Sequence, residues 1–339
     1  MNIPFFAACA IIFLISFLLV YLVTPRAARK MKERGLTARD VNKADRPLIP
    51  NLGGIVMLMG FSIALLLSLQ LHSKDINHEY MLAAVCSITL IAVMGLLDDI
   101  LGLSDKYRVI LPLFAAIPLM VTKAGVTTMN LVFFTVNFDL GVYAVPLLGV
   151  VNINLYSLLL IPIGVIACSN LVNLLAGFNG LEAGAGTIIS ASIFIASIVL
   201  MFMGLHTTEA SFLMIALFGV CLAFLFFNWY PARIFPGNVA TYMIGAAIVA
   251  AVVTGNMERI GVIALTPQII EFFLKARSKF AAENFGRLGK GDRLYYRGKI
   301  HSLTHLLMKT IHPTEKQLVL ILLLFQAVFG ALAVWSIYW

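Results

Sequence analysis

Eight stretches of this chain are long and apolar enough to cross a lipid bilayer as helices. A crossing needs about 20 mostly apolar residues, because the hydrocarbon layer is roughly 30 Å thick. The stretches are 3–23, 52–71, 80–97, 155–172, 186–205, 210–227, 239–255 and 317–338. Only 12% of the residues are charged and 61% are hydrophobic, whereas soluble proteins carry about 25% charged residues. A soluble enzyme, a disordered chain and a secreted disulfide scaffold are therefore excluded.

Two weaker apolar stretches and the distribution of basic residues predict ten crossings in total. The weaker stretches are 109–122, which contains two prolines, and 260–275, which contains one. With ten crossings, every Lys and Arg except Lys74, Lys123 and Arg259 falls in alternate connections on one side. Basic residues are enriched in cytoplasmic loops, so this side is predicted to be cytoplasmic and both termini to lie outside. The net charge of +8 therefore reflects membrane topology and does not indicate nucleic-acid binding.

The sequence thus predicts an all-α integral membrane protein with about ten transmembrane helices, a single domain over 1–339 in the cell membrane. Residues 124–154 are apolar but interrupted by Gly, Asn and Pro, and alternating side chains there predict a small external β-hairpin. The connections predicted to be cytoplasmic, and to carry the active site, are 24–51, 98–108, 173–185, 228–238 and 276–316. The four cysteines lie in apolar stretches and are expected to be packing residues.

Two adjacent acids, Asp98 and Asp99, directly follow an apolar stretch on the cytoplasmic side. Neighbouring carboxylates at a membrane boundary are unfavourable unless a cation neutralises them. Carboxylates, together with other oxygen ligands and substrate phosphate, suit Mg²⁺. The pair is therefore predicted to contribute to a magnesium site, the alternative being two solvated acids at a helix end.

A second polar cluster combines asparagines with glycines where the crossing 155–172 ends. Asn170 and Asn173 are three residues apart and share a helix face, and Asn179 and Glu182 follow. An asparagine side chain offers both a donor and an acceptor, enough to read a base edge or to ligate a metal. For any single asparagine here, capping of the helix end is the alternative.

Basic side chains suited to phosphate lie in two further cytoplasmic connections. Arg233 lies in a proline-containing loop and offers a bidentate fork for phosphate. The long connection 276–316 contains Arg293, Arg297, His301 and His305. The two histidines could share a helix face, but the acid expected at a zinc site is missing, so phosphate contact is favoured.

Together these clusters provide the parts that phosphoryl transfer requires, since that chemistry depends on positioning and on charge stabilisation. The chain has no Walker loop, which excludes an ATP-driven motor of that kind. A transporter or flippase for an anionic substrate is the alternative from another class. It predicts charges near the middle of the membrane, whereas here they gather at the inner ends of the crossings.

In these motifs the chain resembles the polyprenyl-phosphate N-acetylhexosamine-1-phosphate transferases, which move a sugar-1-phosphate from a UDP-sugar to a lipid phosphate and release UMP. The resemblance covers nearly the whole chain and rests on Asp98-Asp99, Asn170–Glu182, Asn228–Arg233 and Thr266–Gln268. Asp40–Lys43, followed by Ile49-Pro50, is similar to the eukaryotic and archaeal branch, which uses UDP-GlcNAc and dolichyl phosphate. The bacterial peptidoglycan branch has adjacent histidines, whereas His301 and His305 are separated here.

The resemblance also implies roles for the matched residues. Asp98 and Asp99 correspond to the catalytic acids, one acting on the lipid phosphate and the other linked to the metal. Asn173 corresponds to a ligand of Mg²⁺, for which Mn²⁺ could substitute, and Asn179 to a contact with uracil. The other expected substrate contacts are Glu182, Arg108, Asn42, Lys43, Arg233, Arg293, Arg297, His301 and His305.

Two positions depart from the family pattern. The family has a metal-ligating aspartate where this chain has Asn238, and the branch usually has glutamate at the position of Asn51. Asn238 keeps one oxygen ligand but removes a negative charge, so weaker Mg²⁺ binding is expected. The same reaction with another UDP-N-acetylhexosamine and undecaprenyl phosphate stays open as an alternative, and a homodimer is compatible with the sequence.

Overall fold

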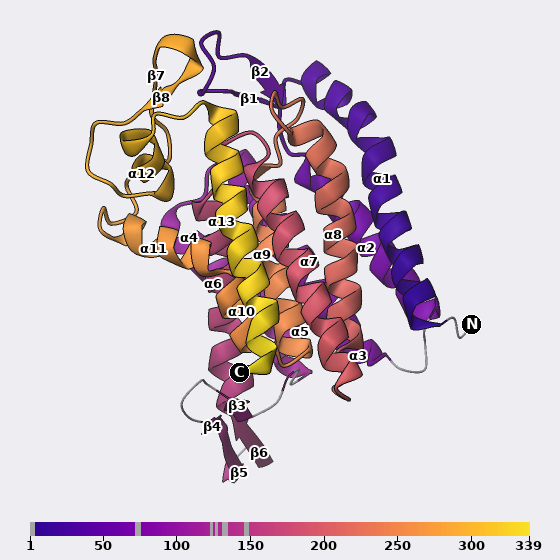
Figure 1. Ribbon diagram of the computed structural model, residues 1–339. Helices are drawn as coiled ribbons and strands as arrows, with labels where there is room; N and C mark the ends of the chain where they lie inside the picture. The colour runs from indigo at the N-terminus through magenta and orange to yellow at the C-terminus, as the bar shows by residue number, and fades with distance from the viewer. Residues whose placement is uncertain (1–3, 72–75, 123–124, 126–127, 131–134, 146–148) are drawn as a thin grey trace.

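The structure is a computed structural model that describes residues 4–71, 76–122, 125, 128–130, 135–145 and 149–339, and most of it is helical (Figure 1). The helices are α1 (Phe5–Glu33), α2 (Gly54–Leu71), α3 (His78–Leu101), α4 (Asp105–Ala115), α5 (Ile117–Val121), α6 (Ile161–Leu174), α7 (Leu181–Phe202), α8 (Thr208–Asn228), α9 (Gly237–Thr254), α10 (Glu258–Ala264), α11 (Thr266–Ala276), α12 (Leu303–Thr310) and α13 (Glu315–Trp335). A π-helical turn (Tyr156–Leu160) precedes α6, and 3₁₀ turns occur at Lys290–Asp292 and Ser336–Tyr338.

Eight of these helical segments are long and apolar enough to span a membrane, and they coincide with the eight strong stretches of the sequence. The two weaker stretches differ from the prediction, because each is built from two short helices. The first is divided at Ala116 between α4 and α5, and the second at Leu265 between α10 and α11. A proline lies within the first two positions of each second helix, where its missing N–H is tolerated.

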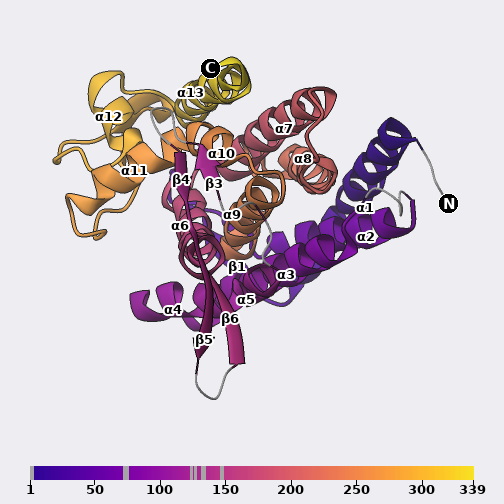
Figure 2. The same ribbon diagram turned by 90° about the horizontal axis from the view of Figure 1, so that it is seen from below.

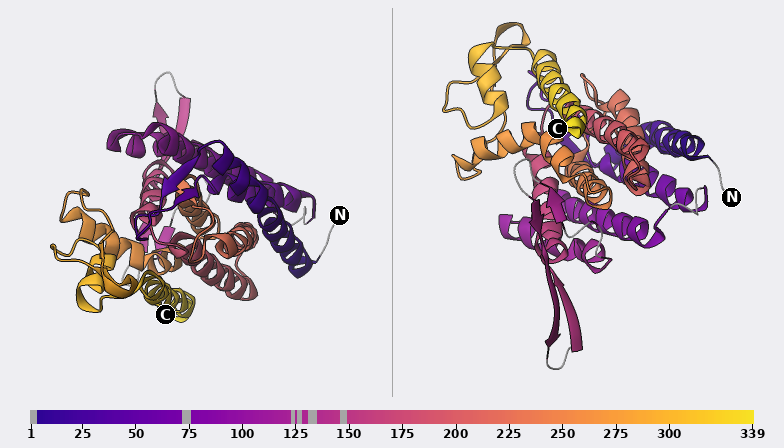
Figure 3. Two further views of the ribbon diagram at one scale, coloured as in Figure 1. Left: turned by 90° about the horizontal axis from the view of Figure 1, so that it is seen from above. Right: turned by 60° about the horizontal axis from the view of Figure 1, so that its bottom comes forward.

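The start of α1 and the C-terminus lie at the lower end of the bundle in Figure 1. The loops that carry most of the basic residues lie at the upper end, together with α12. Two short antiparallel pairs are also found there, β1 (Thr37–Arg39) with β2 (Leu48–Pro50), and β7 (Arg287–Leu288) with β8 (Leu294–Tyr295) (Figure 3, left). The prediction that the two ends of the chain share one side, opposite the basic loops, agrees with this arrangement.

The predicted external hairpin consists of two antiparallel pairs at the lower end. β3 (Thr128–Asn130) pairs with β4 (Thr135–Asn137), and β5 (Asp139–Val145) pairs with β6 (Gly149–Asn154). The second pair projects away from the helices (Figure 3, right). The rest of the segment predicted as one hairpin, 124, 126–127, 131–134 and 146–148, lies outside the described residues.

Helix α9 lies in the middle of the bundle and packs against α2, α3, α6 and α8 (Figure 2). Its sequence is rich in Ala, Val and Gly, and small residues let membrane helices approach closely. A Cβ on Gly245 would lie only 2.2 Å from the carbonyl oxygen of Cys168 on α6. This close packing fixes the first turn of α9, which begins at Gly237, in the centre of the upper end.

Candidate active site

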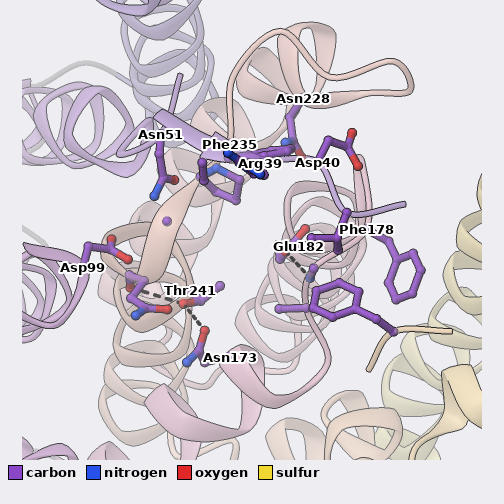
Figure 4. A pocket seen from close by; sticks show the side chains of 18 residues that line it. Arg39, Asp40, Asn51, Asp99, Asn173, Phe178, Glu182, Asn228, Phe235 and Thr241 are labelled. Atoms are coloured by element: carbon purple, nitrogen blue, oxygen red, sulfur yellow. Dashed lines mark hydrogen bonds between the residues drawn. The ribbon is translucent and has the colours of Figure 1, made fainter. Parts of the chain in front are cut away.

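A cavity of about 280 Å³ lies at the upper end of the bundle, among the loops predicted to be cytoplasmic. Asp99 and Asn51 lie on one side of it, and Glu182 and Phe178 on the other (Figure 4). The other lining residues are Ala38, Arg39, Asp40, Val41, Asn173, Ala176, Gly177, Asn228, Phe235, Pro236, Gly237, Asn238, Thr241 and Phe285. Residues from all five connections predicted to be cytoplasmic therefore meet around one space.

Backbone hydrogen bonds join the segment before α2 to the segment before α9. The Phe235 N–H donates to the Pro50 carbonyl over 2.8 Å, and the Gly53 N–H donates to the Phe235 carbonyl over 2.9 Å. At Gly54, the first residue of α2, a Cβ would lie 2.3 Å from the backbone nitrogen of Ala240. Glycine is therefore required where α2 meets α9, and the contact forms one wall of the cavity.

Asp98 is not among the described residues that line the cavity, and its carboxylate is hydrogen-bonded on both oxygens. Its Oδ1 accepts from the Leu103 N–H at 3.0 Å and from Nε and Nη2 of Arg108 at 3.1 and 3.0 Å. Its Oδ2 accepts from Nδ2 of Asn238 at 2.9 Å and from the Tyr242 hydroxyl at 3.4 Å. Arg108, expected to contact a substrate phosphate, is thus paired with Asp98 and only partly exposed.

Asp99, the neighbouring acid, does line the cavity and lies against the first turn of α9. Its Oδ2 accepts from the Val239 N–H at 3.3 Å, so the carboxylate is stabilised by a helix N-terminus. Gly237 makes this approach possible. It has a φ of +70°, and a Cβ there would lie 2.5 Å from Oδ2 of Asp99. Of the two acids, Asp99 is the one that a ligand in the cavity would meet.

Amide side chains complete the polar floor of the cavity. Oδ1 of Asn173 accepts from the Thr241 hydroxyl at 3.0 Å, and Asn238 is held through its nitrogen by Asp98. Asp99, Asn173 and Asn238 offer one carboxylate and two amide oxygens to the same space. This donor set fits Mg²⁺, which binds to proteins through one or two carboxylates and completes its shell with water and substrate phosphate. Among the described residues, no three His, Cys, Asp or Glu side chains form a metal-binding group.

Glu182 occupies the opposite wall of the cavity, in the first turn of α7. Its Oε1 accepts from the Gly177 N–H at 2.7 Å and closes the α6–α7 connection. Its Oε2 is buried and has no hydrogen-bond partner among the described residues. Buried polar atoms without a partner are rare. Glu182 thus combines a structural bond on one oxygen with an unused acceptor on the other.

The Asn179 amide, expected to contact uracil, is used inside the protein. Its Oδ1 accepts from the Ala232 N–H at 2.7 Å and its Nδ2 donates to Asp40 at 3.1 Å. Its backbone N–H donates to Glu315 at 2.8 Å, and only 2% of the residue is exposed. Asn179 is not among the described residues that line the cavity, and its hydrogen bonds make it a bridge between loops. Its contact with uracil stays a prediction.

Lys43 and Asn42, expected to bind substrate, also point into the protein. The Lys43 ammonium forms ion pairs with Glu315 and, at 3.2 Å, with Asp40, and it lies 4.2 Å from the centre of the Tyr230 ring. Nδ2 of Asn42 donates to the Gly177 carbonyl at 3.1 Å. Both side chains fasten the β1–β2 connection over the cavity, and neither lines the cavity itself.

The remaining basic residues predicted to bind phosphate do not reach this cavity. Arg233 is exposed on the α8–α9 loop, whose Tyr230-Pro231 bond is cis, and Nη1 of Arg293 donates to the His312 carbonyl at 2.9 Å. Arg297 lines a second cavity of about 590 Å³. Phe285 lines both cavities, so they adjoin. The structure thus divides the predicted site into an acid–amide cavity and a neighbouring basic and aromatic one.

His305 is buried beneath the second cavity. Its ring stacks on Tyr296, with 3.7 Å between ring centres and 5° between planes, and its Nδ1 accepts from the His301 N–H at 3.4 Å. Burial lowers the pKa of His305 to about 4, and the charges of Lys275 and His301 act in the same direction. His305 is therefore neutral at physiological pH. His305 is not among the residues that line either cavity in the described part of the chain, and its expected contact with phosphate stays a prediction that would use the N–H of a neutral ring.

Several residues at the site were not singled out from the sequence. Asp40, Phe178 and Phe235 lie within motifs that the sequence did reveal, but their types alone gave no reason to select them. Glu315 carried no signal, because a glutamate at the start of α13 looks like an ordinary first-turn acid. Its contacts with Lys43 depend on the folded chain.

Comparison with known proteins shows the family of this chain. The family model described as glycosyl transferase family 4 matches residues 81–256. A Saccharolobus solfataricus protein is 38% identical over 95% of this chain and 94% of its own. It is provisionally named UDP-N-acetylglucosamine–dolichyl-phosphate N-acetylglucosaminephosphotransferase. A Sulfolobus acidocaldarius protein with the same provisional name is 33% identical, over 95% of this chain and 94% of its own. The enzyme of that name from Dictyostelium discoideum is 30% identical over 91% of this chain and 83% of its own.

This chain therefore belongs to glycosyl transferase family 4, and the resemblance seen in its motifs is confirmed. It is a multi-pass membrane protein with eight candidate spans among its described residues. The matched region 81–256 contains Asp98, Asp99, Asn173 and Asn238, so the family match includes the floor of the cavity.

Proposed function

We propose that this protein transfers N-acetylglucosamine-1-phosphate from UDP-GlcNAc to dolichyl phosphate or a related polyprenyl phosphate and releases UMP. The observation that carries the proposal is the meeting of Asp99, Asn173 and Asn238 around one cavity at the basic end of a membrane bundle. A nucleotide sugar reaches this end from water, and a lipid phosphate reaches it along the membrane boundary. The names of the relatives support the choice of UDP-GlcNAc and dolichyl phosphate.

Asp99, Asn173 and Asn238 are the residues that would hold Mg²⁺, or Mn²⁺ in its place. When bound there, the ion neutralises the charge of a pyrophosphate and of the incoming phosphate. The protein's part is to keep one carboxylate and two amide oxygens directed at a common space. The N-terminus of α9, next to Asp99, adds backbone N–H groups that favour anionic substrate oxygens.

The reaction itself needs no strong base from the protein. The second pKa of a phosphate monoester is near 6, so the attacking oxygen of the lipid phosphate is largely ionised at neutral pH. This oxygen forms a bond to the β-phosphorus, and the bond from that phosphorus to the bridging oxygen breaks. UMP leaves with the electron pair. The bond between the sugar and its phosphate stays intact, so the anomeric configuration is retained.

The nucleotide end of the substrate is assigned to the wall that carries Glu182. Phe178, Phe235 and Phe285 line the cavity beside this acid and offer aromatic faces to a planar base. The unused Oε2 of Glu182 is an acceptor for a polar group of the nucleotide. Arg297, at the adjoining cavity, remains our candidate for contact with the sugar-phosphate part.

Purified protein incubated with UDP-GlcNAc, Mg²⁺ and a short polyprenyl phosphate should release UMP. Release should require the lipid and should fall at least about 100-fold in Asp99→Ala, since a ligand of the metal is removed. Asp139→Ala, which removes an exposed acid at the opposite end, is the matched control. Release without lipid, or full activity in Asp99→Ala, would contradict the proposal.

Parallel reactions separate the alternatives that share this chemistry. Dolichyl phosphate is compared with undecaprenyl phosphate, and UDP-GlcNAc with other UDP-N-acetylhexosamines, by the ratio of kcat/KM values. Uptake of radiolabelled UDP-GlcNAc into liposomes without formation of UMP would indicate a transporter instead. The liposomes also test the sidedness of the protein. The proposal places the cavity on the cytoplasmic face of the cell membrane, so UDP-GlcNAc should be used only from the side on which the basic loops lie.

A further inference from the structure

We propose that Asp98 is a positioning residue that holds the Asn238 amide, so that position 238 presents a neutral oxygen beside Asp99. Asp98 and Asp99 are adjacent in sequence, yet their surroundings differ. Asp98 is 3% exposed and is not among the residues that line the cavity within the described part of the chain. The inference deepens the proposed function and rests on it for the identity of the bound ion.

The hydrogen bonds of Asp98 leave no oxygen for a substrate. Oδ1 receives three N–H groups, from Leu103 and from Arg108, and Oδ2 receives the Asn238 amide and the Tyr242 hydroxyl. A carboxylate has room for about four such bonds. Asp98 therefore cannot also orient or deprotonate the lipid phosphate without breaking bonds inside the protein. Of the two acids, only Asp99 lies on the cavity wall, where a metal or a substrate would meet it.

The bond between Asp98 and Asn238 fixes the direction of the amide. Nδ2 of Asn238 donates to Oδ2 of Asp98 at 2.9 Å, and Asn238 itself lines the cavity. The oxygen and the nitrogen of an amide point in different directions, so an amide held by its nitrogen turns its oxygen away from the holder. Asp98 thus selects an amide at position 238 and directs its oxygen away from the buried acid.

The same bond avoids a repulsion that a carboxylate at position 238 would cause. An aspartate at position 238 would place a second carboxylate at hydrogen-bond distance from Asp98. Two carboxylates at that distance cannot both be ionised unless a proton or a cation lies between them. Asn238 supplies an N–H in place of that proton. With asparagine at position 238, the pair therefore needs no cation to avoid repulsion between two carboxylates.

The test is a double-mutant cycle read by thermal unfolding in detergent, with EDTA or with Mg²⁺. Asn238→Asp should lower the Tm in EDTA by about 5 °C, because like charges then face each other. Mg²⁺ should raise the Tm of this variant more than that of the wild type. The exchanged pair, Asp98→Asn with Asn238→Asp, restores a donor and an acceptor, and it should recover at least half of the loss in EDTA.

Asn51→Asp is the matched control, because it adds the same charge to the same cavity and Asp98 accepts no bond from Asn51. When Asn51→Asp is combined with Asp98→Asn, the decrease in Tm should equal the sum of the decreases in the two single variants. Additive losses in the Asp98/Asn238 pair, or an unchanged Tm of Asn238→Asp in EDTA, would overturn the inference. If Asn238→Asp cannot be isolated alone, it is purified in Mg²⁺ and transferred to EDTA before unfolding.

The readout does not depend on transferase activity. Rescue within the pair but no release of UMP would retain the inference and reject the proposed function. Lipid-dependent release of UMP with additive losses would do the opposite. A UMP assay on the exchanged pair then asks whether the aspartate introduced at position 238 raises the apparent affinity for Mg²⁺, as a second carboxylate beside Asp99 should.

Discussion

Lys43 and Glu315 form an ion pair that joins the β1–β2 connection to the first turn of α13, across 272 positions of the chain. Their side chains are only 15% and 3% exposed. Asp40 and Asn179 share the same cluster, since Lys43 also pairs with Asp40 and Glu315 accepts the Asn179 N–H. One ammonium group therefore pairs with two buried acids and joins the loop after α1 to the start of α13.

Replacement of Lys43 by Met should strongly destabilise the fold. The change leaves Glu315 and Asp40 buried without their cation, and removing one partner of a buried pair costs about 3 kcal/mol or more. Thermal unfolding in detergent measures the loss. Lys30→Met is the control, because the Lys30–Glu33 pair is 77% and 50% exposed and such pairs contribute little. Equal Tm values for the two variants would mean that the buried pair contributes nothing.

Gly237→Ala should reduce transferase activity much more than it reduces the stability of the fold. The residue has a φ of +70°, and the new Cβ would lie 2.5 Å from Oδ2 of Asp99, so that carboxylate must move. A misplacement of about 1 Å at a reacting site can reduce the rate about 100-fold. UMP release at saturating substrates and the Mg²⁺ concentration for half-maximal rate are the measurements.

Gly291→Ala provides the matched control for this prediction. Gly291 has a φ of +68°, nearly that of Gly237, but a Cβ there meets nothing within 4 Å. In both variants the strained backbone should lower the free energy of unfolding by a similar amount, about 1 kcal/mol. Only Gly237→Ala should need more Mg²⁺. A similar loss of activity in both would show that the effect comes from backbone strain and not from the contact with Asp99.

The membrane helices could be predicted because the lipid environment imposes one simple rule on sequence, a long apolar run for each span. That rule found the eight long segments but not the breaks at Ala116 and Leu265, which depend on local turns. Polar clusters at the ends of apolar runs likewise revealed Asp99 and Asn173, whereas Asn238 was identified through the family resemblance. The prominence of the clusters comes from the high cost of polar groups near lipid.

The division of roles within the site could not be read from the sequence. Successive residues of a helix point about 100° apart, so Asp98 and Asp99 face different surroundings, and the position of α9 decides which of them lines the cavity. Asn179 and Lys43 lie in recognisable motifs, yet their partners come from the α8–α9 loop and from α13. Contacts across such separations depend on packing, which local patterns do not record.

Asn179→Ala should lower stability and leave substrate recognition in the folded fraction nearly unchanged. The variant keeps the backbone bond to Glu315 but loses three side-chain bonds, with Asp40, with Ala232 and, at a longer 3.5 Å, with Lys43. At about 1 kcal/mol for each of the two shorter buried bonds, a loss of stability near 2 kcal/mol is expected. The KM for UDP-GlcNAc and the Tm are measured together. A raised KM with an unchanged Tm would support direct contact with uracil instead.

Acid should destabilise this protein through His305. Because burial lowers the pKa of His305 in the fold to about 4, from 6.5 for the unfolded side chain, the unfolded chain binds the proton more readily. The contribution of the neutral stacked ring to the stability of the folded protein is fully present above pH 6.5 and is lost as the pH falls toward 4. At 1.36 kcal/mol per pKa unit, the loss of stability reaches about 3 kcal/mol.

The difference in Tm between pH 7 and pH 4.5 should therefore shrink in His305→Gln. His206→Gln, which changes a histidine in an exposed loop, should keep the full difference. Equal pH dependence in both variants would assign the acid sensitivity to other groups.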